Sequence, residues 1–156
     1  MDRSVRVEVL RPGDPRIAGL VEAFAVEWPA WAASVTRREI EAGFESAPGG
    51  ALPRVFVADA GGEAVGTIAL RAWFAEEPLP ETPWVRGLWV APAWRGRGVD
   101  RLLGQAVERA ARSLGHGRLH AATTRIEPLL RRRGWTVFRH VLHDGAPMAW
   151  LVKALA

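Results

Sequence analysis

Apolar and polar side chains alternate with period two along residues 4–10, the pattern of a strand with one buried face. Pro12–Pro15 ends this strand, and Asp14 is a suitable N-cap for a helix that has Pro15 at its first position. Four apolar residues then recur at helical spacing as far as Glu27: Ile17, Leu20, Val21 and Phe24. The chain is therefore predicted to begin as a strand followed by a helix.

The helical pattern stops at Trp28–Trp31, which is predicted as a break. Thr36 and Glu39 have the spacing of a capping box, which opens a second short helix that runs towards Phe44. The first part of the chain is thus predicted as strand, helix, helix.

Residues 54–59 and 64–70 are rich in β-branched residues and flank Gly61–Gly62, the signal of a β-hairpin. A proline-rich loop over residues 76–83 leads from this hairpin into another short apolar run, which ends at Pro92. This run is predicted as a further strand.

A long amphipathic helix follows that strand, because apolar residues recur at the i, i+3, i+4, i+7 spacing: Val99, Leu102, Leu103, Ala106, Val107, Ala110, Ala111 and Leu114. Gly115–Gly117 is predicted to stop it. The rest of the chain is predicted as a strand, a short helix and a hairpin, over residues 118–123, 127–133, and 136–142 with 147–153. The order β-α-α-β-β-β-α-β-α-β-β indicates an α/β (α+β) fold class.

The chemistry concentrates between the strand that ends at Pro92 and the long helix. A loop with two arginines and two glycines, Arg95–Gly98, aims backbone N–H groups and the positive end of a helix dipole at one point. Such a point suits an anion, above all a pyrophosphate. The triphosphate-binding pattern GxxxxGK[ST] and the dinucleotide pattern GxGxxG both fail, because Asp100 and Arg101 follow the glycines.

The same loop resembles the acetyl-coenzyme A loop of the GCN5-related N-acetyltransferase (GNAT) family, whose pattern is Arg/Gln-x-x-Gly-x-Gly/Ala. The match runs from Arg95 to Val99 and departs from the pattern at Asp100. Residues 82–90 are similar to the fourth strand of the family, and residues 127–135 are similar to its "LYxxxGW/GF" segment. The resemblance covers residues 52–155, and the first 50 residues only by their layout.

The resemblance implies the acyl-CoA N-acyltransferase (GNAT) fold, a mixed, mostly antiparallel twisted sheet of about six or seven strands flanked by helices. It implies a single N-acetyltransferase domain over residues 1–156, with acetyl-CoA as cosubstrate and no metal. In the family the fourth strand diverges from the fifth, and the pantetheine pairs there with main-chain groups, here those of Leu88, Trp89 and Val90. The pyrophosphate would be held by Arg95, Gly96, Arg97, Gly98, Val99 and Asp100.

An acceptor amine titrates near 10.4 and must lose a proton before it attacks. The first candidate for a base is Glu81, at the entrance to the fourth strand, followed by Glu76, Glu77 and Glu27. The family commonly places a tyrosine as the acid that protonates the leaving thiolate, but this chain has no tyrosine and Leu130 stands there. A thiol with a pKa near 8.5 leaves unprotonated at a cost of about 2 kcal/mol, so direct transfer without this acid is expected.

The composition limits the other possibilities. The sequence has no cysteine, which excludes disulfides, thiolate nucleophiles and cysteine-based metal sites. Neither a signal peptide nor a membrane-spanning run is visible, so we expect a cytoplasmic protein that acts away from membranes. His116 and His120 have no nearby carboxylate and do not make a metal site. We interpret His120 as a packed, hydrogen-bonded strand residue.

Eight tryptophans are many for a chain of 156 residues. Five of them fall in segments that border the acceptor side in the family, where an aromatic wall can hold a cationic amine: Trp28, Trp31, Trp73, Trp84 and Trp89. We expect most of them to pack in the core or between two copies of the chain in a homodimer.

Three functions remain open at this point. The first is an N-acetyltransferase that moves the acetyl group of acetyl-CoA to a primary amine of a small molecule or peptide. The second is a non-catalytic acyl-CoA-binding or degenerate module of the same fold, since Asp100 and Leu130 depart from the family pattern. The third is nucleic-acid binding through the arginines that give a formal net charge of +4. It ranks behind the others because no recognition motif accompanies the charge.

Overall fold

The structure is a computed structural model, and it describes residues 4–73 and 79–156. Seven strands form one sheet in the order β1-β2-β3-β4-β5-β7-β6 within this described part of the chain. Their bounds are β1 Val5–Val9, β2 Arg54–Ala60, β3 Glu63–Arg71, β4 Trp84–Val90, β5 Arg118–Thr123, β6 Thr136–His143 and β7 Ala146–Ala154. The helices are α1 Ile17–Glu27, α2 Pro29–Ser34, α3 Arg37–Ala42, α4 Val99–Ser113 and α5 Glu127–Arg132, with 3₁₀ turns at Pro48–Gly50 and Pro92–Trp94.

The sheet is mixed, as the sequence predicts. β1 and β2 pair antiparallel, as do β5 with β7 and β6 with β7, whereas β4 and β5 pair in parallel. The predicted fold class is confirmed, and so are the predicted strands, each within a few residues of its predicted bounds. None of the helices in the described residues combines the length and the apolar character that a membrane span requires.

The chain divides into two compact units. The first contains the described residues of Met1–Ala69 together with Gly87–Ala106, and the second contains those of Leu70–Arg86 together with Val107–Ala156. β3, β4 and α4 each contribute residues to both units.

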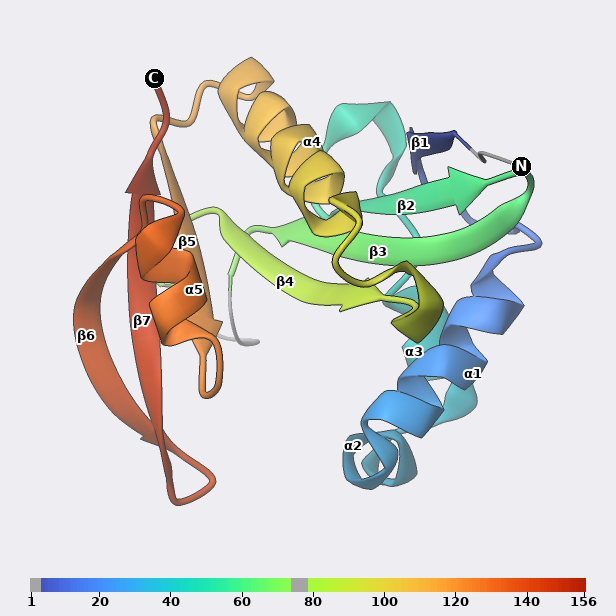
Figure 1. The fold of residues 1–156 in the computed structure, drawn as a ribbon, viewed down its shortest axis with the longest axis horizontal. Helices are drawn as coiled ribbons and strands as arrows, with labels where there is room; N and C mark the ends of the chain where they lie inside the picture. Colours follow the sequence, from blue (N-terminus) through green and yellow to red (C-terminus); the bar gives the residue numbers. More distant parts are fainter. Residues whose placement is uncertain (1–3, 74–78) are drawn as a thin grey trace. The chain divides into compact units, whose positions relative to one another are not determined.

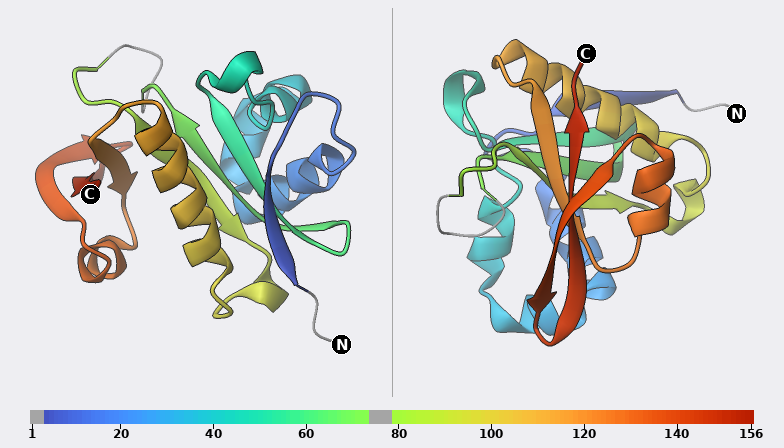
Figure 2. Two further views of the ribbon diagram at one scale, coloured as in Figure 1. Left: turned by 90° about the horizontal axis from the view of Figure 1, so that it is seen from above. Right: turned by 90° about the vertical axis from the view of Figure 1, so that its left-hand side faces the viewer.

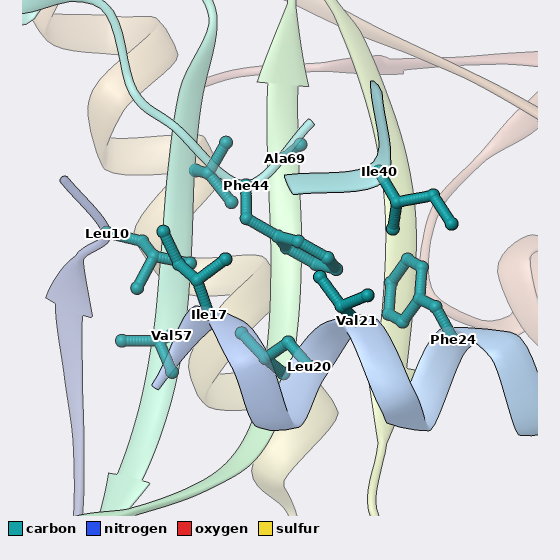
Figure 3. Packing of buried hydrophobic residues seen from close by; sticks show 10 residues of the cluster. Leu10, Ile17, Leu20, Val21, Phe24, Ile40, Phe44, Val57 and Ala69 are labelled. Carbon is teal, nitrogen blue, oxygen red and sulfur yellow. The ribbon is translucent and has the colours of Figure 1, made fainter. Parts of the chain in front are cut away.

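The core of the first unit lies between α1 and the strands. Figure 3 shows the apolar face of α1, Ile17, Leu20, Val21 and Phe24, turned towards the strands. This face packs in a cluster with six residues from other segments: Leu10, Ile40, Phe44, Val55, Val57 and Ala69. α1 lies on one face of β2 and β3, and the beginning of α4 lies on the other (Figures 1 and 2).

The start of α1 corrects one prediction. The helix begins at Ile17, two residues later than predicted, because the Asp14 carboxylate accepts the Arg16 N–H at 2.9 Å and closes a turn before the helix. The guanidinium of Arg16 binds Asp14 at 2.7 Å, and Glu8 and Asp59 at 2.9 Å each. These carboxylates hold the pKa of Arg16 above its usual value, the Asp14 hydrogen bond most of all. The cluster attaches the start of α1 to β1 and β2.

The predicted end of α1 at Glu27 is confirmed, because Trp28 leaves the helical conformation with a φ of -129° and a ψ of 67°. The prediction missed the short helix α2 directly after it, Pro29–Ser34, which has Pro29 in its first turn. The capping box that follows is confirmed. Thr36 accepts the Glu39 N–H at 3.1 Å, and the Glu39 carboxylate accepts the Thr36 N–H at 3.3 Å.

A close approach between β3 and α4 defines the position of the first turn of α4. A Cβ atom added at Gly66 would lie 3.1 Å from Leu103 Cδ1, from Val99 Cγ1 and from the carbonyl oxygen of Trp89. Val99 and Leu103 are almost completely buried. Only glycine therefore lets α4 lie this close to β3.

The second unit contains β5, β7 and β6 in that spatial order, with α5 leading into β6 (Figure 2). A two-residue turn joins β6 to β7, and both of its residues have positive φ, 50° at Asp144 and 77° at Gly145. Such a turn matches the twist of the strands. Lys153 on β7 binds Glu108 of α4 at 2.6 Å within the same unit.

Replacing Gly66 with alanine is expected to lower the free energy of unfolding by about 1–3 kcal/mol, because the new methyl group overpacks two buried side chains and a carbonyl. Gly104→Ala is the matched control, since an added Cβ there meets nothing within 4 Å. Removing a glycine from the interior of α4 is expected to raise stability by about 0.5–1 kcal/mol. Urea unfolding measures both, and an equal effect of the two substitutions would contradict the close approach.

Candidate functional site

A glycine loop joins β4 to α4 in the first unit (Figure 1). Gly96 has a φ of 76° and Gly98 a φ of 83°, a left-handed backbone that costs other residues about 1–2 kcal/mol. A Cβ added at either glycine would meet nothing within 4 Å. The backbone conformation therefore requires the two glycines, and the space next to them is open.

The main-chain N–H groups of this loop are available as donors. The Leu102 N–H donates to the Gly98 carbonyl at 3.2 Å and closes the first turn of α4. Within the first unit, the N–H groups of Gly96, Arg97 and Gly98 donate to no backbone carbonyl of the described residues. The first turn of a helix adds further free donors and a positive dipole end. An anion with several oxygens suits this arrangement.

The arginine side chains of the loop have partners within the protein. Arg95 Nε donates to the Val90 carbonyl at 2.9 Å, and its Nη2 lies 3.3 Å from the Glu27 carboxylate. The guanidinium of Arg97 lies over the ring of Trp94, 4.9 Å from its centroid. Arg95 thus ties the loop to β4 and α1, and Glu27, a predicted alternative base, is occupied by it.

The predicted pantetheine strand contains a feature that the sequence analysis missed. Gly87 has a φ of 67° in the middle of β4, a left-handed conformation that interrupts the extended backbone of the strand and favours glycine. A single glycine inside an apolar strand is the signal that could have revealed it. Of the predicted contact residues beyond it, Leu88 is exposed at 37%, and Trp89 packs against Phe24.

Asp100 lies half-buried in the first turn of α4. A carboxylate there favours the helix dipole by about 0.3–1 kcal/mol, and it competes with any bound anion for the same positive end. The open glycines and the free N–H donors fit a diphosphate. Arg97 and the half-exposed Arg95 add positive charge at the same loop.

The second unit contains a compact aromatic cluster around the start of β4. Trp84 is completely buried, with its ring 5.2 Å from Trp150 and 5.4 Å from His120. Phe138 completes the cluster at 6.0 Å from His120 and 6.2 Å from Trp150. The Trp84 Nε1–H donates to the Glu81 carbonyl at 2.7 Å, which fixes the main chain at Glu81.

The side chain of Glu81 is mostly buried, at 20% exposure. Its Oε1 lies 3.8 Å from Arg139 Nη2. Its Oε2 is buried and has no hydrogen-bond partner among residues 4–73 and 79–156. Leaving a buried oxygen without a donor is costly, so this carboxylate has an unused capacity to accept a proton or a hydrogen bond. The other predicted bases, Glu76 and Glu77, lie outside the described residues.

The interpretation of His120 as a packed, hydrogen-bonded residue is confirmed. It is 7% exposed, its N–H donates to the Pro83 carbonyl at 3.0 Å, and its Nδ1 lies 3.1 Å from the same oxygen. Burial lowers the pKa of His120, opposed by the Pro83 hydrogen bond and the Glu81 charge. Because a carbonyl only accepts, the neutral ring carries its proton on Nδ1. No group of three potential metal ligands occurs in the described part of the chain.

Of the five tryptophans expected to border the acceptor side, only Trp84 lies fully in the core, whereas Trp28 and Trp89 are partly buried against the core of the first unit. Trp84 is completely buried, so it presents no surface to a ligand. In the first unit three tryptophans surround Phe24 at 4.9–6.4 Å: Trp28, Trp31 and Trp89. Trp73 is exposed at 40%.

A mixed seven-stranded sheet in which a glycine loop and a long helix follow the central strand β4 is the architecture of an acyl-CoA N-acyltransferase fold. The chain belongs to the GNAT acetyltransferases, because the family described as "Acetyltransferase (GNAT) family" matches residues 17–135. The resemblance read from the sequence is thereby confirmed. No curated protein matches the sequence.

Solved structures share the fold at low sequence identity. Aminoglycoside 6'-acetyltransferase type Ii is 15% identical, with a TM-score of 0.79 and 97% of each chain covered. Aminoglycoside 6'-N-acetyltransferase complexed with coenzyme A is 14% identical, with a TM-score of 0.78 and the same coverage. N-acetylglutamate synthase from Neisseria gonorrhoeae, complexed with coenzyme A and N-acetyl-glutamate, is 21% identical at a TM-score of 0.65. All of this chain and 36% of that chain are covered.

The lowered pKa of His120 predicts a dependence of stability on pH. The unfolded state takes up a proton near pH 6.5, whereas the folded state does so only at lower pH, so stability falls as the pH decreases between the two pKa values. His120→Asn is expected to flatten this slope in urea unfolding between pH 7.5 and pH 5. His143→Asn, at a half-exposed histidine, is the control and should retain the slope. A slope unchanged by His120→Asn would refute this origin.

Proposed function

We propose that this chain is an N-acetyltransferase that moves the acetyl group of acetyl-CoA to a primary amine of a small molecule or peptide by direct attack. The observation that carries this proposal is the open glycine loop with free N–H donors at the start of α4. Family membership supports acetyl transfer in general. When bound, acetyl-CoA supplies the thioester whose carbonyl carbon receives the amine.

The roles of the loop residues follow from the chemistry of their groups. The N–H groups from Gly96 to Asp100 would hold the diphosphate, together with the charges of Arg95 and Arg97. Main-chain groups of Leu88, Trp89 and Val90 would pair with the pantetheine. The Val90 carbonyl already accepts from Arg95, so this contact also stiffens the strand that the pantetheine would use.

We assign the proton acceptor to Glu81. An ammonium with a pKa near 10.4 is almost entirely protonated at neutral pH and cannot attack in that form. The Glu81 carboxylate is mostly buried, fixed through its main chain by Trp84, and has one oxygen without a donor. In the step, one proton of the ammonium passes to Glu81 and the neutral amine attacks the thioester carbonyl carbon. The C–N bond forms, the electrons of the C–S bond leave with the thiolate, and the second proton lost by the amine nitrogen passes to the thiolate or to water. No tyrosine exists in the chain to protonate the thiolate.

The second candidate function is a non-catalytic module of the same fold, which either binds acyl-CoA without turnover or no longer binds it. Two observations favour it: Asp100 occupies the first turn of α4, and Arg95 is engaged by Glu27 rather than directed only at a ligand. Release of free thiol from acetyl-CoA with a panel of amines separates the two functions. Binding without thiol release would favour the module.

Calorimetric titration of acetyl-CoA tests the loop. The wild-type protein is expected to bind, and Gly98→Ala is expected to bind about fivefold more weakly or worse, because alanine strains the left-handed backbone by about 1 kcal/mol. Gly104→Ala, in the open middle of α4, is the control and should bind like the wild type. Absence of wild-type binding beside tight binding by Asp100→Gly would instead identify a lapsed cofactor site.

Glu81→Gln is expected to lower kcat/KM for amine acetylation about 100-fold, since a positioned base typically contributes this much or more. Its affinity for acetyl-CoA should stay at the wild-type value, because the substitution keeps the size of the side chain. Glu22→Gln, at an exposed carboxylate of α1, should leave both quantities unchanged. A Glu81→Gln variant with wild-type turnover would remove the assigned base.

A further inference from the structure

The described carboxylates of the second unit lie close to basic side chains of the same unit. Glu81 lies 3.8 Å from Arg139, and Glu127 lies 2.9 Å from Arg131 and 3.5 Å from His140. In the same way Glu108 lies 2.6 Å from Lys153, and Asp144 lies 3.5 Å from His143. Among the described carboxylates of this unit, Glu81, Glu108 and Glu127 each lie next to an arginine or a lysine, and the exposed Asp144 lies next to His143.

The basic side chains of the unit exceed these carboxylates. Four exposed arginines form no ion pair with a carboxylate of the described residues: Arg109, Arg118, Arg125 and Arg132. The field of this unit consequently attracts an anionic group and repels a polycation.

Glu81 and Arg139 place a carboxylate and a guanidinium close together, so that one ligand with an ammonium and a carboxylate can contact both. The guanidinium of Arg139 is 52% exposed and lies over two rings, 5.3 Å from the centroid of Trp150 and 5.9 Å from that of Phe138. At 3.8 Å its contact with Glu81 is a long ion pair rather than a hydrogen bond. Both groups therefore keep most of their hydrogen-bonding capacity.

We infer that the acceptor of the proposed acetyl transfer is a small zwitterionic amine of the amino-acid type, whose ammonium binds Glu81 and whose carboxylate binds Arg139. This inference rests on the proposed function, and it names the substrate class. One carbon separates the two charged groups of an α-amino acid, so they can reach two partners that are themselves close together. The guanidinium fork suits a carboxylate, and its position over Trp150 and Phe138 holds it in place.

The same charges argue against a polycationic acceptor. A polyamine or an aminoglycoside carries several ammonium groups, each of which needs a carboxylate or an acceptor oxygen. Among the described carboxylates of the second unit, Glu81 has only a long contact with Arg139, whereas Glu108 and Glu127 are bound at 2.6 Å and 2.9 Å by Lys153 and Arg131. Two of the solved neighbours are named for aminoglycosides, and the charges of this chain differ from what such acceptors require.

The test compares amines that share a carbon skeleton. Thiol release from acetyl-CoA is measured with phenylalanine, phenylalaninamide and phenethylamine, and with spermidine and kanamycin as polycations. The carboxylate is expected to raise kcat/KM about tenfold or more over the other two aromatic amines, as a charge-assisted hydrogen bond does. Arg139→Gln should abolish this preference by raising KM for phenylalanine, with little change for phenethylamine. Arg125→Gln, at an exposed arginine of the same unit, is the control and should keep the preference.

The outcomes separate the two proposals. The inference of a zwitterionic acceptor is overturned if kcat/KM for phenethylamine or for a polycation equals or exceeds that for phenylalanine. It is also overturned if the preference for phenylalanine survives Arg139→Gln. Either result leaves the proposed acetyltransferase activity in place. If no amine releases thiol, equilibrium binding of phenylalanine and phenethylamine in the presence of coenzyme A decides. Tighter binding of phenylalanine that depends on Arg139 supports the inference although the transferase fails, and equal or absent binding of both overturns it.

Discussion

The close approach of α4 to β3 at Gly66 is the constraint on which the candidate cofactor site depends. Val99 and Leu103 are buried against a residue without a side chain, so the first turn of α4 has one available position. That position determines where the free N–H groups of the turn point. The left-handed conformations of Gly96 and Gly98 then direct the loop into it, and the bond from Arg95 to the Val90 carbonyl holds the loop against β4. Binding of an anion by main-chain donors requires this rigidity, because donors that move freely lose entropy when they bind.

In the second unit the main feature of the candidate site is a carboxylate that is mostly buried, that of Glu81. Burial of Trp84 brings its indole N–H to the Glu81 carbonyl, so that the main chain rather than the carboxylate carries the anchoring hydrogen bond. His120, neutral because burial lowers its pKa, packs beside Trp84 without supplying a full charge. Arg139 approaches only to 3.8 Å. Together these contacts hold the main chain at Glu81 in place and leave its buried Oε2 without a hydrogen-bond donor among the described residues.

The sequence predicted those parts of the fold that depend on local chemistry. The capping box of Thr36, the Gly61–Gly62 hairpin turn, the amphipathic α4 and the glycine loop are all determined by residues a few positions apart, and the structure contains each of them. α2 escaped prediction because a six-residue helix has too few apolar positions to show a period. The contacts of Arg16, of Arg95 with Glu27 and of Glu81 with Arg139 join residues far apart in the chain. Such partners depend on the packing of several elements, which a single sequence does not specify.

These long-range ion pairs change what the arginine content means. From composition alone, a net charge of +4 is compatible with phosphate, carboxylate or nucleic acid. In the first unit the Arg95 charge is partly balanced by Glu27, so a diphosphate there would depend chiefly on main-chain donors. In the second unit the described carboxylates Glu81, Glu108 and Glu127 each lie close to an arginine or a lysine, and the exposed arginines Arg109, Arg118, Arg125 and Arg132 form no ion pair with a described carboxylate. The positive charge that remains after local ion pairs are counted is a property of a particular site, whereas the net charge is a property of the whole composition. The first of these selects a ligand, because the opposite charges of an ion pair largely cancel each other's field, whereas an unpaired charge attracts a ligand within about a Debye length of 8–10 Å.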